Sequence, residues 1–337
     1  FGALLDSLDI PHPQYGTATS IDGAIEVGRR IGFPLVVRPS YVLGGRAMEI
    51  VYDLESLKHY MQHAVPASEE HPVLLDRFLE DAYEFDVDAI SDGQQTEICG
   101  IMQHIEEAGV HSGDSMAVLP PFLLSRDQHE DIRESTRMLA GALNVKGLLN
   151  IQFAVMFDTL YVIEVNPRAS PTVPFVSKST GVALAKAATK AMLGRSLAEI
   201  GIQGDLPFTE HISVKESVFP FGKLPGVDLL LGPEMKSTGE VMGIAYDFGA
   251  AYAKAQLGAG QRLPTGGAVF ISVEDKDKPP VVGIAARFRS LGFEILSTSG
   301  TARFLEQNGI QCQHVKKVSM GRPHVADAIK NKTVQLI

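Results

Sequence analysis

The spacing of hydrophobic and polar positions changes along the chain and predicts its elements. In the first 80 residues, helical spacing over 24–31 and near 55–63 alternates with short apolar runs typical of strands. Those strands are expected at 35–40, 47–52 and 73–75. Residues 81–168 are rich in period-two alternation and contain one helical stretch, 128–143, and a further amphipathic helix is expected at 184–192.

The clearest alternation lies in 150–155 and 161–166, which Phe157-Asp158-Thr159 separates as a turn. If this hairpin is centred on Asp158, Gln152 faces Glu164 and Asn150 faces Asn166 on one side of the sheet. The residues between them are then expected on the opposite, apolar side: Ile151, Phe153, Ile163 and Val165.

This register predicts a ladder of one carboxylate and three amides. Oxygen ligands of this kind suit a hard cation such as Mg²⁺, which keeps several waters and shares a substrate phosphate. Arg168 follows Asn166 by two residues, so its guanidinium would lie at the same edge and could bind phosphoryl oxygens bidentately. The pattern alone also fits a polar sheet face exposed to water, with Arg168 as a surface side chain.

A glycine-containing loop separates the second and third predicted strands. Gly44-Gly45 would let backbone amides approach phosphate oxygens, and Arg38 and Arg46 flank it with positive charge. The GxxxxGK[ST] spacing of a Walker loop is absent, and a strand rather than a helix follows. A simple hairpin turn is the alternative.

Two further segments fit a nucleotide site, and a third carries a histidine that could serve in catalysis. Residues 74–79 read as an apolar strand that could offer backbone groups to an adenine edge and Leu79 to its face, and an ordinary buried strand is the alternative. Glu84 begins an alternating acidic strand and could accept hydrogen bonds from ribose hydroxyls, and a solvated acidic face is the alternative that the segment alone favours. Residues 109–115 form a polar loop around His111 that could be a fragment of a catalytic triad, but the GxSxG elbow is missing and no paired nucleophile is evident, so a solvated loop histidine is the alternative.

The rhythm changes after Gly266. Strands at 268–273, 294–298 and 311–315 alternate with helices at 280–291 and 301–306, which predicts a parallel sheet. Residues 198–263, rich in glycine and proline, are interpreted as a connector with helices. The final residues, 333–337, read as an apolar strand with nothing after it, so we expect that the chain was cut inside a domain.

The second strand of this last part runs into a helix through Thr298-Ser299-Gly300-Thr301. Free amides and the helix dipole at such a junction favour an anion. Thr298 and Thr301 could add hydroxyl bonds, and Ser272 and Lys278 follow the first strand. N-capping of the helix is the alternative.

Composition narrows the class of protein. A chain of 337 residues corresponds to about two domains. The formal net charge of −10 argues against a nucleic-acid binder, and no apolar stretch approaches the length of a membrane span. Cys99 and Cys312 form no CxxC pair, which fits a reducing compartment and a cytoplasmic location.

Taken in order, these motifs resemble the ATP-grasp enzymes and, more narrowly, the large chain of carbamoyl phosphate synthetase. The matching runs are residues 38–46, 109–115, 150–154, 164–169 and 173–178. The resemblance covers essentially the whole chain and is closest to the second of that chain's two synthetase units. It implies an ATP-grasp fold over 1–197, with the nucleotide cleft between about 1–80 and 81–197. A connector (198–263) and a parallel-sheet α/β regulatory domain like methylglyoxal synthase (264–337), incomplete at its C-terminus, would follow.

The resemblance also implies the reaction and its cofactors. ATP would phosphorylate carbamate to carbamoyl phosphate with Mg²⁺ or Mn²⁺, for pyrimidine and arginine biosynthesis. The implied partners are a small glutaminase subunit, the N-terminal half of the large chain and a phosphorylated nucleoside effector, with no nucleic acid and no membrane.

The same resemblance implies a role for each matching residue. Arg38 would contact the nucleotide phosphates, Arg77 and Leu79 would flank adenine, and Glu84 would hold the ribose. The nucleotide would be lined by Gly109, Val110, His111 and Ser112. The metal would be bound by Gln152, Glu164 and Asn166, and Arg168 would hold the reacting phosphoryl group. The effector would be bound by Ser272, Lys278, Thr298, Thr301 and Lys317.

One position departs from the family pattern. The family usually has an arginine where this chain has Pro171, which removes an expected anion contact. A fragment that binds nucleotide and effector without turnover is therefore an alternative. Another ATP-grasp ligase, such as a biotin carboxylase-type enzyme, is a third, although no Met-Lys-Met biotin-acceptor segment occurs in the chain.

Overall fold

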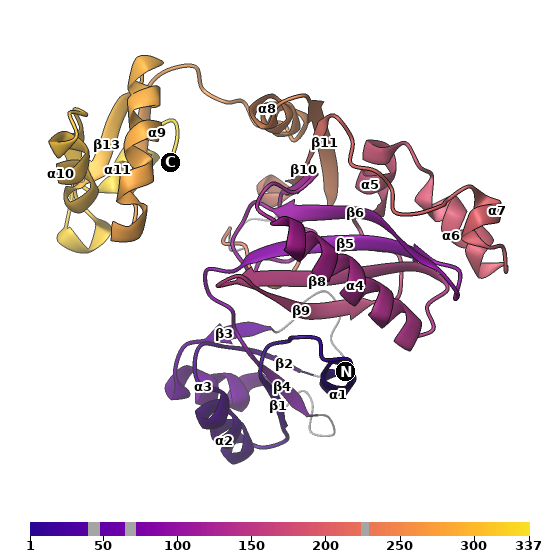
Figure 1. The fold of residues 1–337 in the computed structure, drawn as a ribbon. Helices are drawn as coiled ribbons and strands as arrows, with labels where there is room; N and C mark the ends of the chain where they lie inside the picture. The colour runs from indigo at the N-terminus through magenta and orange to yellow at the C-terminus, as the bar shows by residue number, and fades with distance from the viewer. Residues whose placement is uncertain (40–47, 65–71, 224–228) are drawn as a thin grey trace. The chain divides into compact units, whose positions relative to one another are not determined.

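The chain forms two compact units, residues 1–261 and 262–337, seen in Figure 1. The computed structural model describes residues 1–39, 48–64, 72–223 and 229–337. The glycine loop expected at Gly44-Gly45 and its neighbour Arg46 lie outside the described residues.

Unit 1 begins with a small antiparallel sheet of order β1-β4-β2-β3. Its strands are β1 (Tyr15–Ala18), β2 (Leu35–Pro39), β3 (Glu49–Val51) and β4 (Val73–Arg77), and the accompanying helices are α1 (Gly2–Ser7), α2 (Ile21–Ile31) and α3 (Leu54–Ala64). Helix α2 begins three residues earlier than predicted because Ser20 caps it, its hydroxyl accepting a hydrogen bond from the amide of Gly23. The apolar faces of α2 and α3 bury Leu35, Val37 and Leu75 of the sheet.

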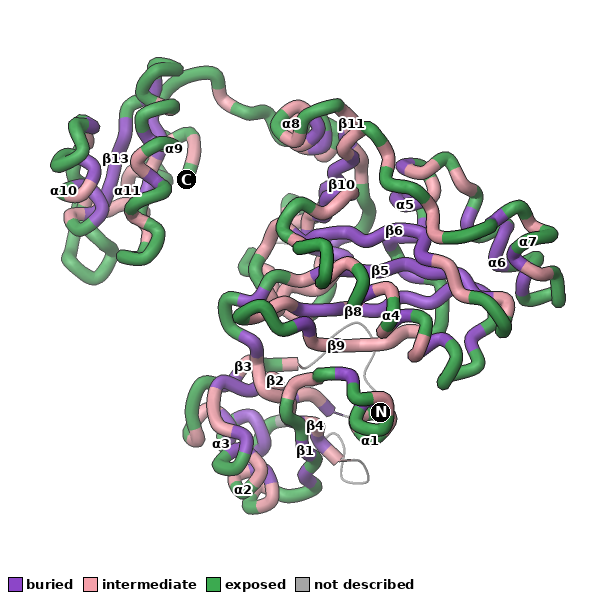
Figure 2. The backbone as a smooth tube through the Cα atoms, in the orientation of Figure 1, coloured by how far each residue is buried: buried purple, intermediate pink, exposed green. Residues whose placement is uncertain are grey.

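The second sheet of unit 1 has seven antiparallel strands in the order β11-β10-β7-β6-β5-β8-β9. They are β5 (Tyr83–Ser91), β6 (Thr96–His104), β7 (Ala117–Leu119), β8 (Gly147–Met156), β9 (Thr159–Asn166), β10 (Ile212–Val218) and β11 (Gly239–Ala245). The associated helices are α4 (Arg126–Ala142), α5 (Val173–Thr180), α6 (Leu184–Met192), α7 (Leu197–Ile200) and α8 (Phe248–Gly258), with a 3₁₀ turn at Phe221–Lys223. Figure 2 shows β5 and β6 buried over most of their length, whereas the edge strand β9 is largely intermediate.

The two faces of this large sheet differ in character. Phe85, Val87, Ile151 and Phe153 point to one face and pack with α4 and α1 into an apolar core. The opposite face is apolar where α5–α7 cover Ile90 and Leu148. Where α5–α7 do not cover this face, the same strands carry polar residues. This polar half of the face could therefore bind a ligand.

The β8–β9 hairpin confirms the predicted register at the ladder. Asn150 pairs with Asn166 and Gln152 with Glu164. A β-bulge then shifts the register by one, so that Phe153 pairs with Val162. The prediction that Ile163 lies on the face of Ile151 is therefore wrong: Ile163 packs against the cluster of Leu79, Ala82 and Ala154.

The interpretation of residues 198–263 as a connector with helices is incomplete, because this segment also contains two strands of the large sheet. Strands β10 and β11 extend the large sheet, and α8 packs against them. In β10, Glu216 interrupts the alternation of Val214 and Val218. In β11, the two glycines, Gly239 and Gly243, weaken the period-two signal.

Gly243 of β11 is required by this packing. A Cβ built there would lie 2.0 Å from the carbonyl oxygen of Ala251 and 2.5 Å from the amide nitrogen of Ala255, both on α8. We expect Gly243→Ala to lower the free energy of unfolding by about 2 kcal/mol, because rigid backbone must shift. Urea titration followed by circular dichroism measures this loss. Gly239 lies in the same strand, and a Cβ built there has no neighbour within 4 Å, so Gly239→Ala should leave the free energy of unfolding nearly unchanged. Equal losses of stability in both variants would contradict the packing argument.

Unit 2 has the parallel sheet that the sequence predicted, in the order β12-β13-β14. Its strands are β12 (Ala268–Ile271), β13 (Glu294–Thr298) and β14 (Gln313–Val315), and its helices are α9 (Lys278–Ser290), α10 (Ser299–Gln307) and α11 (Val325–Lys330), with 3₁₀ turns at Asp275–Asp277 and Val318–Met320. Leu336, in the predicted terminal strand, forms a parallel bridge with Val269 of β12.

Within the described ranges, no helix combines the length and the apolar character needed to cross a membrane.

Candidate functional site

The polar half of the large sheet is built from neighbouring strands in register. Asp86 of β5 pairs with Gln152 of β8, and Gln152 pairs with Glu164 of β9. Two residues along each strand, on the same face, Asp88 pairs with Asn150 and Asn150 with Asn166. The predicted ladder of β8 and β9 thus continues onto β5. Asp86, Asp88 and Asn150 are buried, whereas Gln152, Glu164 and Asn166 are half-buried and reachable by a ligand.

His104 of β6 joins two carboxylates of β5. Its Nε2 lies 3.0 Å from Asp86 Oδ2 and its Nδ1 lies 3.3 Å from Glu84 Oε2, with His104 and Asp86 both buried. Burial alone would lower the pKa of His104, but the hydrogen bonds and charges of Asp86 and Glu84 outweigh it and raise that pKa to about 9. His104 is therefore an imidazolium at neutral pH and holds both carboxylates in place.

The loop predicted to line the nucleotide approaches Glu84. The amide of Gly109 donates to Glu84 Oε1 at 3.1 Å. Gly109 has φ 101°, and a Cβ there would approach the Phe78 ring to 3.0 Å, so glycine is needed at this point.

Two further residues of this loop are held in defined environments. Burial lowers the pKa of His111, opposed by the charges of Asp114, Glu164 and Asp86. The carbonyl of Ser112 accepts a 2.7 Å hydrogen bond from the buried Lys215 of β10. The loop is thereby anchored beside the carboxylates of the ladder.

An apolar cluster borders the polar ladder. Leu79, Ala82 and Ala154 are buried together, and Tyr161 and Ile163 pack against them. A small apolar patch next to hydrogen-bonding backbone suits a flat heteroaromatic ring.

Two predicted arginines lie on the small sheet. Arg38 Nε is 3.3 Å from Asp76 Oδ2, and burial raises the pKa of Asp76 against the opposing effect of Arg38. The guanidinium of Arg77 donates to the carbonyl of Phe33. Both arginines therefore have partners in or next to the small sheet, and among the described residues no hydrogen bond or ion pair joins them to the ladder.

The segment after β9 is tied back to the sheet. Asp88 Oδ1 accepts hydrogen bonds from Ser170 Oγ (2.7 Å) and Asn150 Nδ2 (3.1 Å), and Asp88 Oδ2 accepts one from Thr172 Oγ1 (2.8 Å). Burial raises the pKa of Asp88 to about 6, although Ser170 and Thr172 oppose the rise. Arg168, in the same segment, is exposed, as is Pro171.

The ladder has the donor set of a hard-cation site that shares its ligand with substrate. Among the residues that the structure describes, no group of three or more histidine, cysteine, aspartate or glutamate side chains gathers to hold a metal. Gln152, Glu164 and Asn166 instead offer one carboxylate and two amide oxygens in register on one face. This set fits Mg²⁺, which prefers oxygen and retains waters and phosphate oxygens in its coordination shell.

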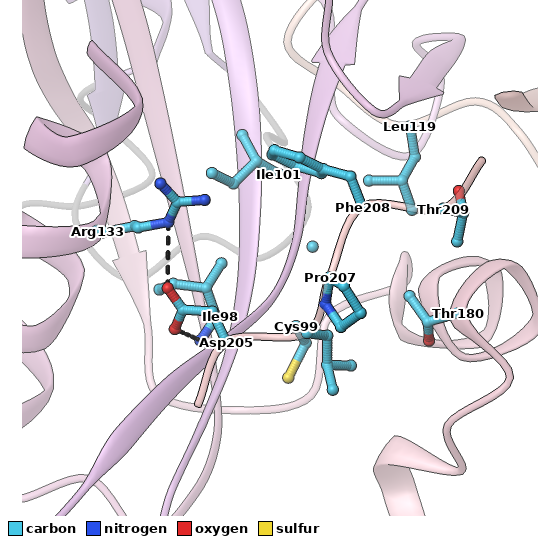
Figure 3. A pocket seen from close by; sticks show the side chains of 12 residues that line it. Ile98, Cys99, Ile101, Leu119, Arg133, Thr180, Asp205, Pro207, Phe208 and Thr209 are labelled. Atoms are coloured by element: carbon cyan, nitrogen blue, oxygen red, sulfur yellow. Dashed lines mark hydrogen bonds and ion pairs between the residues drawn. The ribbon is translucent and has the colours of Figure 1, made fainter. Parts of the chain in front are cut away.

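The pocket in Figure 3 is a separate feature, lined by Ile98, Ile101, Leu119 and Phe208 among others. Arg133 points to Asp205 at its border, with Nε 3.1 Å from Oδ2. Its volume of about 10 Å³ admits no more than about one water molecule, so it is not a nucleotide site.

In unit 2 the predicted effector residues gather at the carboxyl ends of the parallel strands. Ser272 Oγ lies 2.7 Å from Thr298 Oγ1, and Thr301 Oγ1 accepts a hydrogen bond from the amide of Val273 at 3.2 Å. Lys278 Nζ pairs with Asp275 Oδ1 at 2.5 Å and would lie 3.6 Å from a Cβ built on Gly300. Lys317 follows β14, and its charge helps to lower the pKa of Asp275, after the larger effect of Lys278. Ligands of open parallel sheets bind at this edge.

Sequence reasoning missed the buried polar residues behind the ladder. The acidic alternation after Glu84 was compatible with a solvated face, but Asp86 and Asp88 are each 1% exposed, so that alternative is wrong. Their partners His104, Ser170 and Thr172 are distant in sequence, and a local pattern gives no sign of them. The only available signal was that three acidic residues share one face of a strand whose other face is apolar.

Comparison with known proteins identifies relatives along the full chain. Residues 1–200 match the family described as the carbamoyl-phosphate synthase L chain, ATP binding domain, and residues 280–337 match the MGS-like domain. The carbamoyl phosphate synthase large chain of Archaeoglobus fulgidus is 58% identical, over 100% of this chain and 31% of that protein. The C-terminal section of the Aquifex aeolicus large chain is 53% identical, over 100% of this chain and 66% of that protein. The chain thus spans about a third of the full-length large chains it matches.

Solved structures agree on the fold. Biotin carboxylase from Campylobacter jejuni, in complex with an ATP analogue, has a TM-score of 0.60 at 16% identity and covers 76% of this chain and 64% of its own. The biotin carboxylase domain of the Hydrogenobacter thermophilus 2-oxoglutarate carboxylase, with MgADP and bicarbonate, has a TM-score of 0.58 at 17% identity. That match covers 71% of this chain and 60% of the carboxylase domain chain. These likenesses concern the fold alone. With the two antiparallel sheets of unit 1 and the parallel sheet of unit 2, they confirm the predicted fold class.

Proposed function

Because the chain belongs to the carbamoyl-phosphate synthase large-chain ATP-binding family, we propose that it is an ATP-dependent ligase segment that phosphorylates carbamate. The products would be ADP and carbamoyl phosphate. The observation that carries this proposal is the ladder of Gln152, Glu164 and Asn166 in register on one face, next to an apolar patch and the Gly109 loop.

The proposed chemistry is an in-line phosphoryl transfer. A carbamate oxygen attacks the γ-phosphorus of ATP, a P–O bond to that oxygen forms, and the bond to the ADP oxygen breaks. Gln152, Glu164 and Asn166 would hold Mg²⁺ or Mn²⁺, which when bound neutralises phosphate charge. Arg168 would approach the equatorial oxygens of the transferred group, where charge is concentrated in the transition state.

The nucleotide would lie along the same face. The Leu79 cluster would contact the adenine ring, and Glu84, held by His104 and the Gly109 amide, would accept hydrogen bonds from the ribose hydroxyls. Val110, His111 and Ser112 would line the ligand. Arg38 and Arg77 remain proposed nucleotide contacts that require the partners they have here, Asp76 and the Phe33 carbonyl, to be exchanged on binding.

The regulatory part of the proposal concerns unit 2. The proposed effector site lies at one edge of the parallel sheet, where five side chains with hydroxyl or ammonium groups converge: Ser272, Lys278, Thr298, Thr301 and Lys317. Their chemistry supports an anionic, phosphate-bearing effector there. A glutaminase subunit and the preceding half of the large chain are proposed partners, with carbamoyl phosphate passing to pyrimidine and arginine synthesis.

A second candidate function is nucleotide and effector binding without turnover. Pro171 favours it, because an arginine is usual there in the family and this position lies exposed between Ser170 and Thr172. The biotin carboxylase-type alternative has only the shared fold in its support.

A test of both candidates measures ATP formation from ADP and carbamoyl phosphate by the 337-residue chain, with and without Mg²⁺. The proposal predicts Mg²⁺-dependent ATP formation, whereas ADP binding by calorimetry without any ATP formation would favour the binding-only candidate. If this chain forms no ATP but a longer chain does, the segments missing from this chain are needed for the activity.

Pro171→Arg is expected to raise the rate of ATP formation about tenfold, because a guanidinium at the exposed edge adds a charged contact to the phosphoryl group. The measurement is the initial rate at saturating ADP. Pro174→Arg, which adds the same charge at another exposed position nearby, is the matched control. Equal stimulation by both variants would show a general effect of charge and contradict a specific role of position 171.

A further inference from the structure

Asp88 is a buried carboxylate that contacts no part of the proposed ligand positions directly. Its side chain lies at the junction of the polar and apolar halves of the sheet face, between Asp86 and Ile90 on β5. Three donors from two other segments converge on its two oxygens: Asn150 of β8, and Ser170 and Thr172 of the segment that follows β9. A carboxylate is normally excluded from such a position, since removing its charge from water is costly unless several donors compensate.

The three donors connect Asp88 to two parts of the site. Asn150 is the cross-strand partner of Asn166, so one contact bears on the ladder itself. Ser170 and Thr172 follow Arg168 by two and four residues, and their hydroxyls also lie 2.7 Å from each other. In the segment 167–172, residues 167–169 and 171 are exposed, and within the part of the chain that the structure describes its side-chain hydrogen bonds to the sheet are those to Asp88. The Asp88 contacts are therefore the principal described attachment of this segment to the sheet.

We propose that Asp88 is a positioning residue, which clamps the segment of Ser170 and Thr172 onto β5 and so fixes Arg168 and Asn166 relative to Glu164. The inference rests on the proposed function for its catalytic consequence, but the clamp itself is a statement about structure. The clamp also gives a role to the hydroxyls of Ser170 and Thr172 on either side of residue 171, since both bind Asp88. By holding both neighbours, the clamp determines where the side chain at position 171 emerges.

The physical effect of the clamp would be on rate rather than on nucleotide affinity. Phosphoryl transfer depends on alignment within a fraction of an ångström, whereas ADP is held mainly by contacts elsewhere on the face. Losing the clamp should therefore lower kcat and leave the KM for ADP nearly unchanged. Replacing a residue that merely supports the fold would instead change both kcat and the KM for ADP. It would also reduce the protection of the whole sheet against amide hydrogen exchange.

The test uses Asp88→Asn and Ser170→Ala in the 337-residue chain. Asp88→Asn keeps the shape and removes acceptor strength, and Ser170→Ala removes one donor with little change in volume, in case the first variant fails to fold. Asp205→Asn is the matched control, because Asp205 also accepts hydrogen bonds from a backbone amide and an arginine but lies outside the ladder. Two quantities are measured: amide hydrogen exchange over 166–173 without ligand, and kcat and KM for ADP in ATP formation.

We expect exchange over 166–173 to rise at least tenfold in Asp88→Asn, with that of β5 unchanged, and kcat to fall at least tenfold with KM within twofold. Ser170→Ala should shift both quantities in the same direction by a smaller factor, and Asp205→Asn should change neither by more than twofold. Unchanged exchange over 166–173 would overturn the clamp, as would a uniform rise over the whole sheet or a parallel loss of kcat and ADP affinity. If neither the unsubstituted chain nor a longer chain forms ATP, the proposed function fails, while the exchange measurement on this chain still decides whether the clamp exists.

Discussion

Replacing Glu164 by glutamine is expected to lower the rate of Mg²⁺-dependent ATP formation about 10³-fold, which corresponds to ~4 kcal/mol. Glu164 is the only carboxylate among the three ladder residues proposed to hold the metal, so its loss leaves amide oxygens alone. Neutral oxygens neutralise little of the metal's charge and bind it weakly. Initial rates across a series of Mg²⁺ concentrations measure the effect, and excess Mg²⁺ should restore only part of it.

The same hairpin provides the control for this experiment. Asp158→Asn removes one negative charge at the turn, far along the strands from the ladder. Asp158 has φ 63°, a conformation that asparagine tolerates well. This variant should keep its rate within twofold of the unsubstituted chain. A Glu164→Gln variant with at least half of the original rate would rule out the metal assignment.

Replacing His104 by glutamine is expected to lower the free energy of unfolding by about 3 kcal/mol near pH 6.5 and by progressively less toward pH 9. The buried imidazolium lies between Glu84 and Asp86, while Lys215 from β10 acts on the same Asp86 and Glu106 lies near. Because the pKa of His104 is raised to about 9 in the folded chain, its stabilisation is complete below the unfolded pKa of 6.5. That stabilisation is lost as the pH rises through 9.

Urea titrations at several pH values between 6 and 10 measure this difference. His12→Gln is the matched control, because His12 forms a 2.9 Å ion pair with the exposed Asp6 in the same unit. Surface ion pairs contribute little, so this variant should differ from the unsubstituted chain by less than about 1 kcal/mol at every pH. A His104→Gln deficit that stays constant from pH 6.5 to 9 would mean that packing, rather than charge, accounts for the loss.

Much of the local structure was readable from the sequence, because short-range periodicity determines which residues share a face. The β8–β9 register is the clearest example: a turn centred on Asp158 correctly placed Gln152 opposite Glu164. Helix α6 (Leu184–Met192) and strand β13 (Glu294–Thr298) match their predicted bounds. The bulge after Gln152 was not readable, since it depends on how the two strands twist against their neighbours, and it moved Ile163 to the other face.

The sequence by itself determined the ladder of Gln152, Glu164 and Asn166, the parallel sheet of unit 2 and the family to which these motifs point. Only the tertiary structure decided that Asp86 and Asp88 are buried, that His104 lies between two carboxylates, and that Ser170 and Thr172 attach to β5. The physical reason is that the free energy of a buried charge depends on partners brought together from distant segments. A local pattern shows which residues share a face, but not what covers that face.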